Sequence, residues 1–163
     1  MLHPIAEQIN SVNDWRQIGL GVFGWHDALI KLGIRYGDAD SLILADKIGK
    51  EMINNAVLAS SKLTHIWGQY PKYNKDAVLK SKFFQTNIDE SIKKYVEENG
   101  LAHSQLLTIP PTGSIATMFG VSTAIEPIYN ISYIRKTESL HGREELYKVY
   151  TPIVDEYMKL TNI

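Results

Sequence analysis

The stretch Ser104-Gln-Leu-Leu-Thr-Ile-Pro-Pro-Thr-Gly-Ser-Ile-Ala-Thr-Met-Phe-Gly120 decides how this chain is interpreted. Residues 106–109 form an apolar run of strand type. Pro110 and Pro111 must end it, because proline has no N–H and disfavours the helical region for the residue before it. A new apolar-periodic segment then runs from about Ser114 to Phe119. The pattern predicts a strand, a tight turn and the start of a helix.

The predicted helix start has the properties of an anion site. A helix that begins near Thr112 or Gly113 has unpaired N–H groups in its first turn and the positive end of its dipole behind them. Gly113 lets a phosphate approach the backbone closely, and the hydroxyls of Thr112, Ser114 and Thr117 can donate further hydrogen bonds. The stretch has neither the glycine spacing nor the lysine of a P-loop. The alternative is an ordinary turn in which Thr and Ser only cap the helix.

Composition places the chain among soluble globular proteins of one ordinary domain. It has 163 residues, of which 44% are hydrophobic and 21% are charged, and its net charge is −1. No basic excess suggests a nucleic-acid polymer as partner, and no apolar stretch approaches the roughly 20 residues that span a bilayer. We therefore expect a cytoplasmic protein that binds neither nucleic-acid polymers nor membranes.

Cysteine is absent, which excludes disulfides, thiolate metal sites and cysteine nucleophiles from this chain. The histidines show no metal-ligand spacing, so we assign no metal and expect each to have a partly exposed structural role. They are His3, His26, His65, His103 and His141.

Gly19-Leu-Gly21-Val-Phe-Gly24 matches the G-x-G-x-x-G fingerprint of dinucleotide-binding domains. The fingerprint requires a strand before its first glycine, within a βαβ unit. Residues 13–18 are too polar for a buried strand, and the sequence after Asp40 is helical where a second strand is needed. An NAD-binding oxidoreductase domain is kept as an alternative function. We expect these glycines instead to allow close packing between backbones.

A long helix is predicted over residues 41–67, with Asp38 or Asp40 as its cap and Gly68 at its end. Its predicted apolar face consists of Leu42, Ala45, Ile48, Met52, Ala56, Ala59, Leu63 and Trp67.

Shorter elements are predicted around this helix. Helices are expected in residues 1–12, 74–83, 87–99 and 143–160, the last with a break near Pro152. Asn87 and Glu90 have the spacing of a capping box. The Ile and Tyr content of residues 128–135 predicts a strand, which we expect to pair with the strand at residues 105–109.

Longer motifs in the chain resemble the large, catalytic subunit of ribonucleotide reductase. They are Ser104–Ile115, Gly120-Val-Ser-Thr-Ala-Ile-Glu-Pro-Ile128, Tyr133-Ile-Arg-Lys136, Arg16-Gln-Ile-Gly-Leu-Gly-Val-Phe-Gly-Trp25 and Ala28-Leu-Ile-Lys-Leu-Gly33. The resemblance covers most of residues 14–136 and is nearest to the adenosylcobalamin-dependent type and the related aerobic types. It departs from the family at Ala102-His103, where members commonly carry Arg-Asn.

The resemblance implies an α/β fold, as a mostly helical fragment with at least two strands from the ten-stranded α/β barrel. It implies that the Pro-Thr-Gly-Ser loop binds the substrate phosphates through Thr112, Gly113, Ser114, Ile115 and Ala116. The implied reaction converts ribonucleotides to 2′-deoxyribonucleotides by radical chemistry, in support of DNA replication. The implied partners are a nucleotide substrate, the remainder of the large subunit and a second copy in a homodimer.

The family generates its radical on a cysteine in an Asn-x-Cys-x-Glu loop and reduces the ribose with a further cysteine pair, and this chain has none of these residues. We therefore expect residues 1–163 to be a single fragment of the barrel domain, with no catalytic residue and no cofactor of its own, and inactive alone. Adenosylcobalamin or a separate radical-generating subunit would serve the full enzyme. The alternatives are a complete protein that has lost the chemistry, and a helical interaction module without a ligand.

Overall fold

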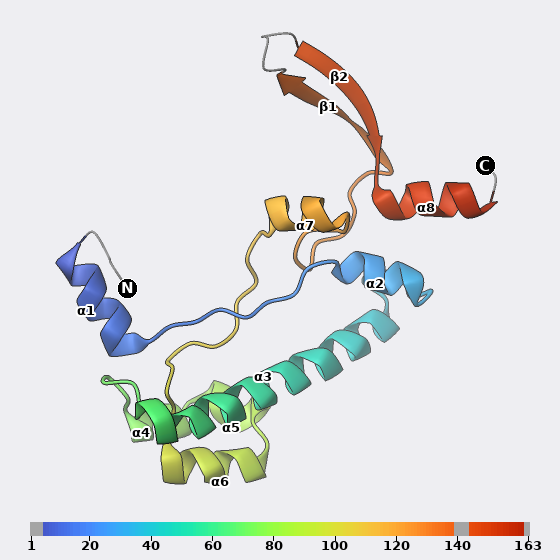
Figure 1. The fold of residues 1–163 in the computed structure, drawn as a ribbon. Coiled ribbons are helices and arrows are strands. Elements are labelled where there is room, and N and C mark those ends of the chain that lie inside the picture. Colours follow the sequence, from blue (N-terminus) through green and yellow to red (C-terminus); the bar gives the residue numbers. More distant parts are fainter. Residues whose placement is uncertain (1–4, 139–143, 162–163) are drawn as a thin grey trace. The chain divides into compact units, whose positions relative to one another are not determined.

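The computed structural model describes residues 5–138 and 144–161, which form eight helices and two strands (Figure 1). The helices are α1 (Ala6–Trp15), α2 (Trp25–Lys31), α3 (Ala39–Trp67), α4 (Lys75–Leu79), α5 (Lys82–Asn87), α6 (Glu90–Asn99), α7 (Gly113–Phe119) and α8 (Pro152–Thr161). The strands are β1 (Ser132–Glu138) and β2 (Glu144–Tyr150). The chain divides into two compact units. Unit 1 comprises residues 1–21 and 42–108, and unit 2 comprises residues 22–41 and 109–163.

Unit 1 has an apolar core where α5 and α6 pack on α3. Val57 of α3, Phe84 of α5 and Val96 of α6 are each at most 4% exposed. Full burial of an apolar side chain of this size contributes about 1.5–3 kcal/mol. The same core includes residues from the connecting segments, namely Tyr70, Ile88 and Leu101.

The predicted long helix is confirmed, but its predicted buried face is wrong. α3 ends at Trp67, and Gly68 follows in the left-handed region with φ +69°. Leu42 and Trp67, both from the predicted face, are more than half exposed. The buried residues of α3 in unit 1 are instead Asn54, Val57, Ser60 and Ser61. Apolar periodicity could not identify this face, because the burial of polar side chains depends on hydrogen-bond partners elsewhere in the chain.

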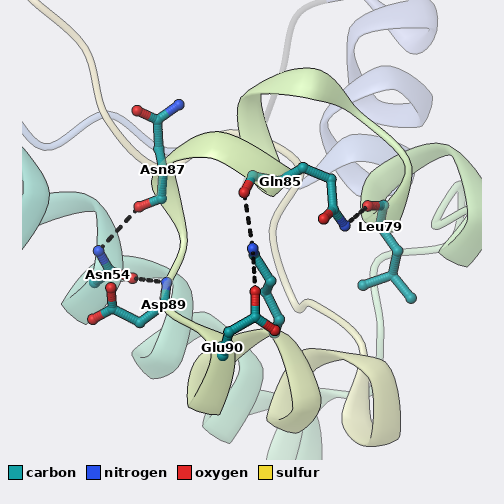
Figure 2. Close-up of polar contacts among 7 residues, drawn as sticks. Asn54, Leu79, Gln85, Asn87, Asp89 and Glu90 are labelled. Atoms are coloured by element: carbon teal, nitrogen blue, oxygen red, sulfur yellow. Dashed lines mark hydrogen bonds and ion pairs between the residues drawn. The ribbon is translucent and has the colours of Figure 1, made fainter.

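Asn54 joins α3 to the connection between α5 and α6 (Figure 2). Its side-chain amide donates to the Asn87 carbonyl oxygen (3.1 Å), and its Oδ1 accepts the Asp89 N–H (2.8 Å). Asp89 is the N-cap of α6, and its own side chain makes no capping bond. The predicted capping box from Asn87 to Glu90 is therefore wrong. In a capping box the glutamate would accept the N-cap N–H, and here Asn54 accepts it from another helix.

Unit 1 contains a parallel pairing between residues 15–20, which follow directly from the end of α1, and residues 104–108. The Leu20 N–H donates to the Leu106 carbonyl (2.9 Å), and the Leu20 carbonyl accepts the Thr108 N–H (3.0 Å). These bonds form a single parallel bridge between Leu20 and Leu107. The strand predicted at residues 105–109 is thus reduced to this bridge, and the predicted pairing with residues 128–135 is wrong.

Unit 2 contains α2, α7, α8 and an antiparallel hairpin of β1 and β2, whose register runs from Ser132 opposite Tyr150 to Glu138 opposite Glu144. β1 begins four residues later than predicted. The helix predicted over residues 143–160 is wrong in its first half, because β2 has the alternating pattern and Tyr and Val content of a strand. α8 begins at Pro152, where a break was predicted, because proline is well suited to the first turn of a helix. The part of that prediction at residue 143 lies outside the described residues.

The described residues are mostly helical and contain one two-stranded sheet, so they do not themselves close a barrel. None of the helices that the structure describes combines the length and apolar character required to cross a membrane.

Candidate functional site

The predicted loop leads directly into α7, which begins at Gly113, one residue before the predicted Ser114. Thr112 is the N-cap residue and has φ +50°, in the left-handed region that β-branched residues rarely adopt. Its side chain makes no capping bond. Instead, Thr112 Oγ1 accepts the N–H of Ala124 (2.8 Å). The alternative, in which Thr112 only caps the helix, is therefore wrong: Thr112 occupies the N-cap position, but its side chain does not bond to the N–H groups of α7.

The first three N–H groups of α7 are accessible. Within residues 5–138 and 144–161, the N–H groups of Gly113, Ser114 and Ile115 donate to no protein group, and all three residues are exposed. A Cβ atom added at Gly113 would have no neighbour within 4 Å. The Ala116 N–H already donates to the Thr112 carbonyl (2.9 Å), and Ala116 is fully buried. The amides open to a ligand are thus those of residues 113–115.

Polar side chains near these amides are few. Thr117 Oγ1 donates to the Gly113 carbonyl (2.9 Å), so this hydroxyl is engaged within α7. The only charged residue in positions 109–131 is Glu126, whose carboxylate accepts the Thr123 hydroxyl (3.1 Å). An anion bound at the start of α7 would therefore be held by backbone N–H groups, with no cation from this segment.

Residues 121–128 are held by α2 within unit 2. The Gly24 N–H donates to the Ser122 carbonyl (2.8 Å), and the buried carboxylate of Asp27 accepts the Ser122 N–H (2.6 Å). His26 Nδ1 accepts the Ile128 N–H (2.7 Å). Neither His26 nor Asp27 was predicted to take part in the site. From the sequence, the one available signal for Asp27 was an acidic residue in the first turn of a short helix.

Gly19 and Gly24 allow close packing, but against side chains and not, as predicted, between backbones. A Cβ atom at Gly19 would lie 2.7 Å from Thr108 Cγ2 in unit 1, and one at Gly24 would lie 3.3 Å from Val121 in unit 2. The dinucleotide alternative lacks its structural context, because among the described residues α2 is followed by α3 and by no strand of a βαβ unit.

Unit 1 brings together Ser60 and His103, which the sequence analysis did not link. His103 is 7% exposed, its Nδ1 lies 3.1 Å from Ser60 Oγ, and its N–H donates to the same oxygen (3.2 Å). Burial, and to a smaller extent the charge of Arg16, lower the pKa of His103. The expectation that each histidine is partly exposed is wrong here. Ser60 is itself 1% exposed, so the pair fixes the start of the segment 104–108 and offers no nucleophile to a substrate.

Comparison with known proteins gives a consistent result. The family model described as the ribonucleotide reductase barrel domain matches residues 1–161. The ribonucleoside-diphosphate reductase subunit alpha of Chlamydia trachomatis is 30% identical over 179 aligned residues, which cover 97% of this chain and 17% of that protein. The vitamin B12-dependent ribonucleoside-diphosphate reductase of Thermoplasma acidophilum is 33% identical, with coverage of 86% and 16%. The ribonucleoside-diphosphate reductase large subunit of equine herpesvirus 2 is 30% identical, with coverage of 82% and 18%.

The chain spans about a sixth of the length of these relatives. The family match extends over nearly all of it and includes the loop at residues 112–116. These comparisons support neither the dinucleotide-binding alternative nor the ligand-free helical module. The chain therefore belongs to the ribonucleotide reductase large-subunit family and corresponds to part of its barrel domain.

Proposed function

We propose that this chain forms part of a ribonucleotide reductase catalytic subunit and supplies the loop, residues 112–116, that binds the substrate phosphates. The whole subunit would convert ribonucleotides to 2′-deoxyribonucleotides by a radical route. The observation that carries the proposal is the set of accessible N–H groups at Gly113, Ser114 and Ile115, in a chain of this family. A phosphate can accept several such bonds at one helix start.

In this proposal only backbone amides of the loop bind the phosphates, and they determine the affinity expected for a nucleoside diphosphate. A hydrogen bond to a charged group contributes about 1.5–3 kcal/mol, and three of them are partly offset by the cost of immobilising the ligand. For the 163-residue chain this suggests a Kd for a nucleoside diphosphate on the order of 1 mM. Tighter binding would need contacts to the ribose and base from elsewhere in the full subunit.

The radical chemistry would lie outside residues 1–163, because the chain has no cysteine. Two relatives, from Thermoplasma acidophilum and Mycobacterium tuberculosis, are named vitamin B12-dependent, which supports adenosylcobalamin as the radical source of the full enzyme. A separate radical-generating subunit is the alternative source. Within the described residues no group of three or more His, Asp or Glu side chains is arranged to hold a metal ion. That this chain binds no cofactor of its own remains a prediction.

We propose further that the parallel pair of residues 15–20 and 104–108 belongs to the ten-stranded barrel. Parallel sheets are normally covered on both faces, yet Ile18 and Leu20 are 48% and 57% exposed. The remainder of the large subunit would cover this surface. A homodimer of the full subunit and a cytoplasmic location remain predictions.

Nucleotide titration of the isotope-labelled chain tests the phosphate loop. A nucleoside diphosphate should shift the NMR signals of the Gly113, Ser114 and Ile115 amides, whereas NAD should shift no signal at Gly19 or Gly24. Gly113→Val should lower the affinity about tenfold or more, since it places a side chain over amides that make charge-assisted bonds. An added Cβ at Gly113 has no neighbour within 4 Å and Gly113 is exposed, so the fold should be kept.

Gly49→Ala is the matched control, because Gly49 is also a helical glycine with no atom within 4 Å of an added Cβ. This variant should bind the nucleoside diphosphate as the parent chain does. If the diphosphate shifts signals elsewhere but none at residues 113–115, the proposed loop is wrong. If NAD shifts the signals at Gly19 and Gly24, the dinucleotide alternative is restored.

A further inference from the structure

Asp27 is a buried acidic residue whose described side-chain hydrogen bond goes to Ser122, outside the phosphate loop of residues 112–116. Its side chain is 5% exposed, and its Oδ2 accepts the Ser122 N–H at 2.6 Å. Burying a carboxylate is unfavourable unless hydrogen bonds compensate it. Asp27 lies in the first turn of α2, where the helix dipole also favours a negative charge. Its burial therefore indicates a specific structural task.

The contacts of Ser122 connect Asp27 to the start of α7. The Ser122 carbonyl accepts the Gly24 N–H (2.8 Å), so both backbone polar groups of Ser122 are held by residues at the beginning of α2. Two residues further on, Ala124 is 3% exposed and has φ +42°. Its N–H donates to Thr112 Oγ1 (2.8 Å). The path thus runs from Asp27 through residues 122–124 to Thr112, entirely within unit 2.

The bond from Ala124 explains why the amides of α7 are accessible. An N-cap threonine normally uses its hydroxyl oxygen to accept an N–H from the second or third residue of the helix. In this chain Thr112 Oγ1 is directed to Ala124 instead, and Thr112 adopts a left-handed conformation that its side chain disfavours. Residues 122–124 therefore hold the cap hydroxyl away from the amides that a phosphate would need.

We propose that Asp27 is a positioning residue of the phosphate loop. Its carboxylate fixes Ser122, which places the Ala124 N–H against Thr112 Oγ1 and leaves the N–H groups of Ser114 and Ile115 available to the substrate. This inference rests on the proposed function for its purpose. The geometry it describes can be tested without any ligand.

Amide hydrogen exchange of the full 163-residue chain, followed by NMR, provides that test. Asp27→Ala should speed exchange at Ser122 and Ala124 about tenfold or more, because a bond to a charged acceptor is lost. The Ser114 and Ile115 signals should shift in the same variant. Asp27→Asn, whose amide oxygen can still accept the Ser122 N–H, should keep exchange slow. Asp38→Ala is the matched control, because Asp38 is exposed and the hydrogen bonds described for it involve only its backbone N–H and carbonyl.

Titration with a nucleoside diphosphate then separates this inference from the proposed function. Asp27→Ala should weaken binding, Asp27→Asn should restore it, and Asp38→Ala should leave it unchanged. If the parent chain binds no diphosphate, the proposed function fails, while the exchange results still decide whether Asp27 positions Thr112. Unchanged exchange at Ala124 in Asp27→Ala overturns the inference, whatever the ligand does.

Thr112→Val keeps the test decisive if the Asp27→Ala chain does not fold. Valine retains the branched shape of threonine and loses the acceptor for the Ala124 N–H. This variant should speed exchange at Ala124 and shift the Ser114 and Ile115 signals. Unaltered exchange and signals at these positions would overturn the inference.

Discussion

Gly19 lies where two extended segments of unit 1 run in parallel, and the structure leaves no room there for a methyl group. An added Cβ would lie 2.7 Å from Thr108 Cγ2 and 3.2 Å from Thr108 Cβ. Non-bonded carbon atoms pack at about 3.5–4.0 Å, so Gly19→Ala must displace Thr108 by roughly 1 Å. We expect the free energy of unfolding to fall by about 1–3 kcal/mol, the usual cost of overpacking.

Urea denaturation followed by circular dichroism measures this loss, and a double-mutant cycle tests its cause. Thr108→Ser removes the closest atom, Cγ2, and by itself should cost less than about 0.8 kcal/mol, since it deletes one half-buried methyl group. The double variant Gly19→Ala/Thr108→Ser should recover most of the stability, with a coupling energy of about 1 kcal/mol or more. Gly49→Ala, with open space around its Cβ, should instead stabilise the chain by up to about 1 kcal/mol.

Additive losses in the double variant would refute the explanation by close contact. If Gly19→Ala were fully stable but lost a measurable affinity for NAD, the fingerprint would have the ligand-binding role that the fold argues against. Either result would require a different account of residues 15–20.

Three further substitutions test other parts of the fold and share the same unfolding assay. Asn54→Ala should cost roughly 2–4 kcal/mol, because the Asn87 carbonyl at the end of α5 and the Asp89 N–H at the start of α6 lose their partner. Asn55→Ala, at an exposed position, should change stability by less than about 0.5 kcal/mol. Equal effects of the two would contradict the role given to Asn54. Ser81→Ala removes the N-cap acceptor of α5 and should cost about 1 kcal/mol, and no loss would show that this cap is dispensable. Folding lowers the pKa of His103, so as the pH falls its imidazole is protonated in the unfolded chain before it is protonated in the folded chain. The neutral, buried imidazole therefore contributes fully to the free energy of unfolding above about pH 6.5, and this contribution is lost as the pH falls through the folded-state pKa. His103→Gln should flatten the dependence between pH 8 and 5, and an unchanged slope would exclude His103 as its source.

The sequence predicted those elements that are defined by local patterns. α3 follows from a long run of apolar residues at helical spacing, and the turn before α7 follows from Pro110 and Pro111. Residues 144–150 show the limit of this reasoning, since a short alternating segment can be taken for part of a neighbouring helix. Only the pairing of β2 with β1 across the hairpin settled its conformation.

The candidate loop was located from the sequence, but its supporting contacts were not. Asp27 and Ser122 are 95 residues apart, and neither has a local pattern that indicates the other. Ser60 and His103 are likewise separated, by 43 residues, and a serine in the middle of a helix looks like a solvent-exposed position. What the sequence did not reveal is which distant segments contact one another. Residue patterns in a single sequence do not supply that information.

Unit 2 is built from two separate stretches of the chain, and this determines when it can form during synthesis. α3 to α6 are continuous in the chain and can fold as soon as the ribosome has released residues up to about 101, because domains form progressively as the chain emerges. α2 has seven residues, too few for a stable isolated helix in water. Its hydrogen-bond partners at Ser122 and Ile128 are translated 95 and 102 residues after it. The bonds that Asp27 and His26 make to residues 122 and 128 can therefore form only after residues 42–101 have left the ribosome.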